Sequence, residues 1–150
     1  MTTFTIMRVE ASAVVDLRER VMWPGRRDMC VLAEDAAGVH LGAVDRRGAT
    51  SDQQPPLIGV ISLFMDEGGV ARFRKLCTHP ERRCEGIGSA LVIRSIAEAE
   101  EAGAVALECD SRQSASKFYS RLGFQQVGAP FTKYAGAPPY VRMRRDLNGR

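Results

Sequence analysis

The stretch RRCEGIGSAL, residues 82–91, places Gly86 and Gly88 behind two arginines and ahead of an apolar run. Glycine adopts backbone conformations that other residues avoid, so this pair predicts a tight turn. The apolar residues that follow predict a helix over residues 86–101, ended by Gly103. The first N–H groups of a helix have no partner within it, and its N-terminus carries partial positive charge. The stretch therefore predicts a turn that can hold an anion such as a phosphate.

Three phosphate-binding turns can be compared with this stretch. A P-loop requires G-x-x-x-x-G-K-S/T, and the chain contains no such string. The dinucleotide fingerprint G-x-G-x-x-G/A fails, because its sixth position is Leu91 and the turn comes late in the chain. The third pattern, Q/R-x-x-G-x-G/A, fits Arg83, Gly86 and Gly88. Alone, this string is also compatible with a helix that merely begins with glycines.

Hydrophobic patterning and turn residues predict the elements around this stretch. The expected strands are residues 4–10, 29–33, 40–44, 57–65, 70–78 and 105–109, with closing strands that begin at 123–124 and end with 140–147. The other expected helices are a segment that Ser12 caps and that ends at residues 23–25, and residues 114–122, which Ser114 caps. A meander followed by strand–helix–strand–helix–strand predicts an α+β fold with a mixed sheet.

Two motifs identify a known family. KLCTHPERRCEGIGSAL, residues 75–91, resembles the pyrophosphate-binding segment of the GNAT superfamily of N-acetyltransferases, and SASKFYSRLGF, residues 114–124, resembles its A-x-x-F-Y-x-x-x-G-F signature. LRERVMWPG and PPYVRMRRDL also resemble a bacterial subgroup of uncharacterised GNAT proteins. The resemblance implies one GNAT-like acyltransferase domain over residues 1–150, with a mixed, mostly antiparallel central sheet flanked by helices.

The resemblance also implies acetyl-CoA as the cofactor. In the family, the strand before the glycine loop pairs with the pantetheine arm, and the loop amides bind the pyrophosphate. Ser111 and Arg112 stand where the family often has an asparagine that contacts the cofactor. The implied cofactor-binding residues are Leu76, Cys77, Thr78, Arg83, Cys84, Glu85, Gly86, Ile87, Gly88, Ser89, Ser111, Ser114 and Tyr119. Cys84 and Glu85 depart from the usual filling of the loop. The carboxylate of Glu85 would have to point away from the phosphates, with its side chain facing solvent.

The implied reaction transfers an acetyl group to a primary amine of a small molecule or peptide, by direct attack in a ternary complex. Tyr119 is the implied acid for the departing thiolate, and a backbone N–H near Cys77 is the implied oxyanion donor. Glu108 is the first choice for the general base, Glu67 is the second, and a water relay without a single base stays open. Covalent catalysis by Cys109 is an alternative, although a buried cysteine is more often a small hydrophobic residue. A non-catalytic acyl-CoA-binding regulatory module is the alternative function.

Composition limits the remaining possibilities. The net charge of +3 suits an anionic small ligand and falls short of the basic stripe of a nucleic-acid binder. The N-terminal segment has no signal-peptide pattern, no apolar run is long enough to span a membrane, and the four cysteines and two histidines lack metal-ligand spacing. We expect a cytoplasmic protein with reduced thiols, no metal, no nucleic-acid partner and no membrane partner. A homodimer through the final strands, common in the family, stays open.

The acceptor amine is the partner that the sequence defines least. The expected acceptor site lies across the sheet from the glycine loop and is lined by the first helix, residues 23–25, Tyr134 and Tyr140. Three arginines near it suggest an acceptor that carries a carboxylate or a phosphate: Arg18, Arg26 and Arg27.

Overall fold

The computed structural model describes residues 3–47, 56–66 and 68–147. They form two compact units. Unit 1 consists of Met1–Phe64 and Lys75–Ser95, and unit 2 of Met65–Arg74 and Ile96–Arg150. The predicted single domain over residues 1–150 stays a prediction.

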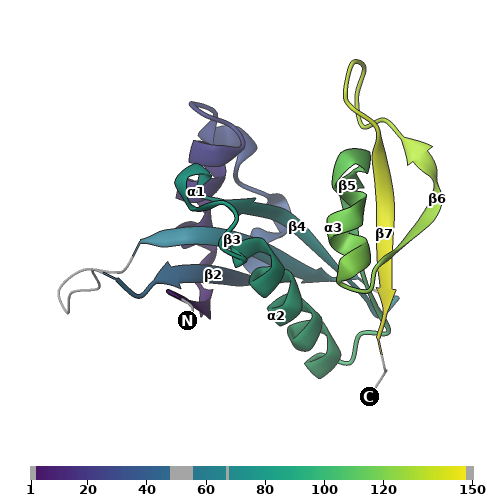
Figure 1. Cartoon of the computed structure of the whole chain (residues 1–150), viewed down its shortest axis with the longest axis horizontal. Helices are drawn as coiled ribbons and strands as arrows, with labels where there is room; N and C mark the ends of the chain where they lie inside the picture. The colour runs from purple at the N-terminus through teal and green to yellow at the C-terminus, as the bar shows by residue number, and fades with distance from the viewer. Residues whose placement is uncertain (1–2, 48–55, 67, 148–150) are drawn as a thin grey trace. The chain divides into compact units, whose positions relative to one another are not determined.

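The elements follow the predicted α+β order (Figure 1). The strands are β1 (Phe4–Val9), β2 (Val39–Asp45), β3 (Leu57–Met65), β4 (Val70–Thr78), β5 (Ala106–Arg112), β6 (Gln125–Phe131) and β7 (Tyr140–Asp146). The helices are α1 (Ala11–Val21), α2 (Ile87–Glu101) and α3 (Ser116–Arg121), and the short 3-10 helices are η1 (Arg27–Met29), η2 (Ala33–Ala37), η3 (Pro80–Arg82) and η4 (Gln113–Ala115). Hydrogen-bonded neighbours run β1-β2-β3-β4-β5-β7-β6. The β1–β2, β2–β3, β5–β7 and β6–β7 pairs are antiparallel and β4–β5 is parallel, which confirms the mixed, mostly antiparallel sheet.

In unit 1, α1 and the start of α2 cover opposite faces of the sheet. Val14 and Leu17 of α1 pack with Val60 and Cys77. The neighbouring residue Gly59 faces the other way, because successive residues of a strand point to opposite faces. A Cβ atom built on Gly59 would lie only 2.5 Å from Cγ2 of Ile87 and 3.1 Å from Cδ1 of Leu91. The missing side chain of Gly59 therefore lets the first turn of α2 lie close to β3.

The predicted strand over residues 29–33 is wrong. The segment between α1 and β2 instead forms η1 and η2, with irregular backbone between them. The apolar run Cys30-Val31-Leu32 favoured a strand, but Val31 is more than half exposed. Side-chain bonds hold the segment: the backbone N–H of Leu32 donates to Oδ2 of Asp35 at 2.9 Å, and Arg18 binds Asp35.

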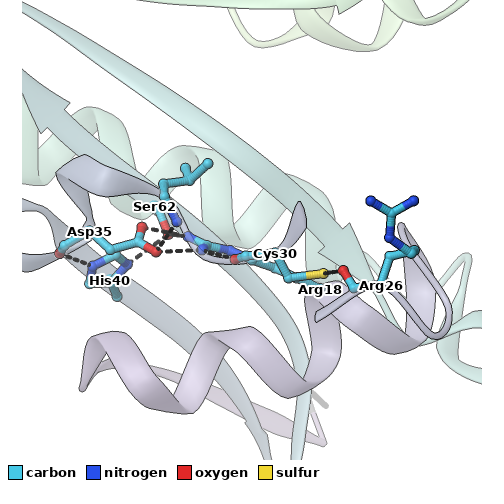
Figure 2. Close-up of polar contacts among 7 residues, drawn as sticks. Arg18, Arg26, Cys30, Asp35, His40 and Ser62 are labelled. Atoms are coloured by element: carbon cyan, nitrogen blue, oxygen red, sulfur yellow. Dashed lines mark hydrogen bonds and ion pairs between the residues drawn. The ribbon is translucent and has the colours of Figure 1, made fainter. Parts of the chain in front are cut away.

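Arg18 is the centre of this buried network (Figure 2). Its Nη1 donates to the carbonyl oxygen of Cys30 at 2.7 Å and to Oδ2 of Asp35 at 2.8 Å. Its Nη2 donates to Oδ1 of Asp35 at 3.0 Å and to Oγ of Ser62 at 2.7 Å. The side chain of Arg18 is 0% exposed, so the charge is removed from water and compensated inside the unit. Arg18 thereby ties α1, the connecting segment and β3 together.

His40 extends the same network. Its Nε2 lies 2.7 Å from the carbonyl oxygen of Asp35 and its Nδ1 lies 2.7 Å from Oγ of Ser62. A carbonyl oxygen only accepts, so Nε2 carries the proton. In the neutral ring Nδ1 then accepts from the Ser62 hydroxyl, whose oxygen in turn accepts from Arg18. The Ser62 hydroxyl thus donates to His40 and accepts from Arg18.

In unit 2, α3 packs on an aromatic cluster. The ring of Tyr119 lies 5.8 Å from that of Phe73, 4.9 Å from that of Phe118 and 5.8 Å from that of Phe124. Gly123, which precedes Phe124, has φ +90°, and a Cβ atom there would collide with Nη1 of Arg145. That Nη1 donates to the carbonyl oxygen of Leu122 at 2.8 Å. The glycine of the second motif is therefore needed both for its backbone and for the space beside Arg145.

Two predicted helix caps are also wrong. Helix α1 begins at Ala11, one residue before Ser12, and its N-cap residue Glu10 makes no side-chain cap bond. Helix α3 follows η4, has Ala115 as N-cap and also lacks a side-chain cap bond, so Ser114 does not cap it. The predicted helix over 86–101 is confirmed to within one residue. Among the described residues, no helix has both the length and the hydropathy that crossing a membrane requires.

Candidate functional site

The second half of β4 carries the first set of candidate residues. The parallel register with β5 covers Val70 to Arg72, and Lys75 then has φ +59°, in the left-handed region. A left-handed residue in a strand is typical of a bulge, which redirects the backbone that follows. Leu76, Cys77 and Thr78 come directly after Lys75 in unit 1.

Cys77 is a packing residue on this strand. It is 6% exposed and lies in the apolar cluster with Val14, Leu17 and Val60. Burial raises the pKa of its thiol to about 12, so the thiol stays protonated at neutral pH. The side chain of Cys77 therefore belongs to the core, and its backbone is what a ligand could use.

The glycine loop joins β4 to α2. His79 is the N-cap residue of η3, and its Nδ1 accepts a hydrogen bond from the N–H of Glu81 at 3.1 Å. Cys84 and Gly86 then have φ values of +66° and +81°. These two left-handed residues turn the chain into α2, which starts at Ile87.

This loop has the geometry of an anion site. The carbonyl oxygen of Gly86 accepts the first helical bond, from Ala90 at 3.0 Å, so the N–H groups of Ile87, Gly88 and Ser89 precede the hydrogen-bonded turns of α2. A Cβ atom built on Gly86 would meet nothing within 4 Å, so a ligand has room to approach the backbone there. The loop thus combines open backbone donors with the positive end of a fifteen-residue helix.

The two arginines before the loop have different surroundings. Arg82 donates to Asp45 at 2.5 Å and to both oxygens of Glu85 at 2.7 and 3.0 Å. Arg83 is exposed and has no hydrogen bond or ion pair to any residue that the structure describes. The carboxylate of Glu85 is thus held by Arg82, and its expected direction away from the phosphates stays a prediction.

Tyr119 is the candidate acid of the reaction and lies in unit 2. Its side chain is 9% exposed, and burial raises the pKa of its hydroxyl well above the ordinary value, with a smaller contribution from Cys109. Cys109 is itself 3% exposed, and burial raises the pKa of its thiol as well. A protonated buried thiol is a poor nucleophile, so these surroundings favour a packing role for Cys109. Tyr119 therefore keeps its proton at neutral pH.

Glu108 is engaged by two arginines. Its Oε2 accepts from Nη1 of Arg144 at 2.9 Å, and its Oε1 lies 3.5 Å from Nη2 of Arg72. Both contacts follow from the strand registers, which set Glu108 opposite Arg144 on β7 and opposite Arg72 on β4. A base needs an oxygen within reach of the proton that it takes, and here each oxygen already has a cationic neighbour. The second candidate base, Glu67, lies outside the described residues.

The remaining candidates in unit 2 are two serines. Ser111 is buried and its Oγ donates to the carbonyl oxygen of Arg112 at 2.7 Å. Ser114 is exposed in η4. Unit 2 therefore holds Glu108, Ser111, Ser114 and Tyr119, whereas unit 1 holds the β4 end and the glycine loop.

The arginines that suggested an anionic acceptor are all paired. Arg18 binds Asp35 in the core, Arg26 binds Asp28 at 2.9 Å, and Arg27 binds Asp16 at 2.7 Å and Glu19 at 3.2 Å. Arg18 is therefore buried in the core, whereas Arg26 and Arg27 are exposed, and the anionic acceptor stays a prediction. The structure also shows what the sequence missed, the Arg18 network, although one signal was present: Arg18 falls on the apolar stripe of α1 between Val14 and Val21.

Comparison with known proteins gives the family context. The family model described as an acetyltransferase (GNAT) domain matches residues 31–147. The chain is similar to the uncharacterized N-acetyltransferase YitI of Bacillus subtilis, at 25% identity over 134 residues that cover 84% of this chain and 85% of YitI.

No group of histidine, cysteine, aspartate and glutamate side chains in the described part of the chain could hold a metal ion.

Solved structures share the fold. A crystal structure of a proposed N-acetyltransferase from Lactobacillus plantarum has a TM-score of 0.80 at 21% identity, covering 97% of this chain and 99% of that one. An aminoglycoside 6'-N-acetyltransferase in complex with coenzyme A has a TM-score of 0.73 at 18% identity, covering 97% of this chain and 98% of that one. At these identities the structures show a common fold.

Proposed function

The chain belongs to the GNAT acetyltransferase family, and we propose that it transfers the acetyl group of acetyl-CoA to a primary amine of a small molecule or peptide in the cytoplasm. The family assignment makes it an N-acetyltransferase that uses acetyl-CoA and an amine acceptor. The amine class, the direct attack in a ternary complex and the residue roles below are the proposal.

The observation that carries the proposal is the glycine loop. Left-handed Cys84 and Gly86, the open backbone beside Gly86 and the exposed Arg83 fit a pyrophosphate. In the proposal, the N–H groups of residues 84–89 and the side chain of Arg83 hold the pyrophosphate of acetyl-CoA. The backbone of Leu76, Cys77 and Thr78 pairs with the pantetheine arm. The cofactor roles of Ser111 and Ser114 stay predictions, as the exposed Ser114 and the hydrogen-bonded Ser111 give no separate support.

Acetyl-CoA supplies an activated thioester, whose acetyl group passes to the amine nitrogen as the thiolate leaves. A backbone N–H near Cys77 donates to the carbonyl oxygen where negative charge develops. Tyr119 donates a proton to the departing thiolate. Burial raises the pKa of its hydroxyl, which keeps the hydroxyl protonated at neutral pH but makes it a weaker acid. Three phenylalanine rings pack around the Tyr119 ring and fix its position.

The acceptor amine must lose its proton before it attacks, since an alkyl ammonium has no lone pair. Glu108 and a water relay are the two candidate routes for that proton. The ion pairs of Glu108 with Arg144 and Arg72 favour the water relay, because an amine would have to compete with two guanidinium groups. In that case Glu108 fixes the arginines of unit 2.

The experiment begins with calorimetric titration of acetyl-CoA into the native protein and into Gly86→Glu. We expect micromolar binding that weakens by about tenfold or more in the variant, since a carboxylate then lies among the loop donors. Gly69→Glu is the matched control: Gly69 also has positive φ and open space around it, but lies in the turn before β4. Absence of binding by the folded native protein would contradict the proposal.

The catalytic step is tested by measuring CoA release over a panel of amines with Tyr119→Phe. We expect kcat to fall by about 100-fold, in the range of a lost general acid, with little change in acetyl-CoA affinity. Native protein that binds acetyl-CoA but acetylates no amine, with Tyr119→Phe identical to it, would favour the non-catalytic binding module instead.

A further inference from the structure

Arg82 and Arg83 precede the glycine loop and have different surroundings: Arg82 is bound to carboxylates, and Arg83 is exposed. This difference indicates different roles for the two arginines. We infer that Arg82 is a positioning residue for acetyl-CoA: it holds the carboxylate of Glu85 away from the loop donors, and leaves Arg83 to meet the phosphates. The inference rests on the proposed function, in which this loop binds the pyrophosphate.

The grip of Arg82 on Glu85 is a two-point contact. Nε of Arg82 lies 2.7 Å from Oε2 of Glu85, and Nη2 lies 3.0 Å from Oε1. Such a fork fixes the plane and direction of the carboxylate as well as its distance. The pKa of Glu85 is lowered, chiefly by these hydrogen bonds from Arg82, so Glu85 is ionised at neutral pH. The loop therefore contains an ionised carboxylate, and Arg82 determines the orientation of that carboxylate.

Arg82 is itself anchored outside the loop. Its Nη1 donates to Oδ2 of Asp45 at 2.5 Å, and its Nη2 lies 3.4 Å from Oγ1 of Thr3. Asp45 is the last residue of β2, so the guanidinium group is bound to a strand of the sheet. The side chain of Arg82 is only 14% exposed. It thus holds Glu85 from a fixed position, and its donors are used on carboxylates rather than being open to a ligand.

The hydrogen bonds from Arg82 to Glu85 are important for ligand binding because of where Glu85 lies in the loop. It stands between left-handed Cys84 and left-handed Gly86, and the open donors of α2 begin immediately after it. A carboxylate released there would compete for the same N–H groups and would repel a pyrophosphate. Arg83 is exposed and has no ion pair with a residue that the structure describes, so its charge remains available to an anion.

The test measures acetyl-CoA affinity by calorimetry. The single variants are Arg82→Gln, Arg83→Gln and Glu85→Gln. Two double variants combine Glu85→Gln with Arg82→Gln or with Arg83→Gln. Arg82→Gln should weaken binding by about tenfold, because it frees the Glu85 charge. The double variant Arg82→Gln/Glu85→Gln should recover to within about twofold of Glu85→Gln, whereas Arg83→Gln should weaken binding about tenfold with either residue at position 85. Arg26→Gln, which removes an exposed arginine paired with exposed Asp28, is the control for net charge.

Rescue by Glu85→Gln is the result that a merely structural role of Arg82 would not produce. If the double variant binds as weakly as Arg82→Gln, or if Arg82→Gln binds like the native protein, the inference is wrong while the proposed function stands. If the folded native protein does not bind acetyl-CoA, the proposed function fails and this inference fails with it. Should Arg82→Gln not fold, Arg82→Lys replaces it, since lysine keeps the charge toward Asp45 but lacks the two-point grip.

Discussion

Arg18 and Arg82 both join segments that are distant in sequence, but they do so in different surroundings. Arg18 is 0% exposed and its partner Asp35 is 8% exposed. Arg82 is 14% exposed, and its partner Glu85 is 34% exposed. Four hydrogen bonds link Arg18 to three residues, and its buried Nε has no partner in the structure. The polar groups of the buried cluster bind one another, whereas the loop cluster lies beside open donors.

The Arg18–Asp35 and Arg82–Glu85 ion pairs therefore have different roles, although both join an arginine to a carboxylate. A buried charge that loses its partner is strongly destabilising, whereas an exposed pair contributes little to stability. We therefore expect the Arg18 cluster to determine whether unit 1 folds, and the Arg82 cluster to determine how its loop binds.

The largest effect is expected for Arg18→Met. The variant leaves the Asp35 carboxylate buried without its counter-charge, so the free energy of unfolding should fall by about 3–5 kcal/mol. Urea unfolding followed by circular dichroism measures it. Arg20→Met, an exposed position on the same helix, should stay within about 0.5 kcal/mol of the native protein. An Arg18 variant as stable as the native protein would show that the network contributes nothing to folding.

A smaller loss is expected for Ser62→Ala. Removal of the hydroxyl leaves Nη2 of Arg18 with one acceptor fewer and Nδ1 of His40 without its donor, which should cost about 1–3 kcal/mol. The same unfolding measurement applies, and Ser12→Ala, at an exposed position of α1, is the matched control. Equal stabilities of the two variants would contradict the buried role of Ser62.

The smallest effect separates the two clusters by pH. Burial raises the pKa of Asp35, but hydrogen bonds from Arg18 and from the Leu32 N–H outweigh it, so the net pKa is lowered. Stability from such a carboxylate is complete above its unfolded pKa, about 3.9, and is lost as pH falls through the folded pKa. Asp35→Asn should therefore be less stable at neutral pH and should lose less than the native protein below about pH 4.

Glu85→Gln is the contrasting variant in that acid titration. Its carboxylate also has a lowered pKa, but solvent and salt screen it. Its unfolding curve should follow that of the native protein at every pH, and any difference should vanish in about 1 M salt. If Asp35→Asn and Glu85→Gln gave the same pH profile, the distinction between the two clusters would not hold.

The parts of the fold that could be predicted from the sequence depend on local patterns. Gly86 and Gly88 mark the start of α2, and the continuous apolar run of β3 indicates a buried strand. The motif residues Tyr119 and Gly123 identify α3 and the turn after it. In each case residues close in sequence carry the whole signal.

The parts that could not be predicted depend on distant partners. The segment over residues 29–33 has strand-like composition, but Arg18 and Asp35, 17 positions apart, pair across it and hold it in turns. Glu108 looked available as a base because its arginine Arg144 is 36 positions away on β7. A charged residue inside a buried strand or on an apolar helix stripe signals that such a partner exists without saying which residue it is.

Cys84 offers a practical use of the loop geometry. Of the four cysteines, Cys30, Cys77 and Cys109 are buried and Cys84 alone is exposed. A thiol-reactive fluorophore therefore attaches at Cys84 in the folded native chain, without engineered cysteines. The dye then sits between Arg83 and Glu85, at the point where the backbone turns into α2, and its emission can report on ligand arrival at this loop in real time.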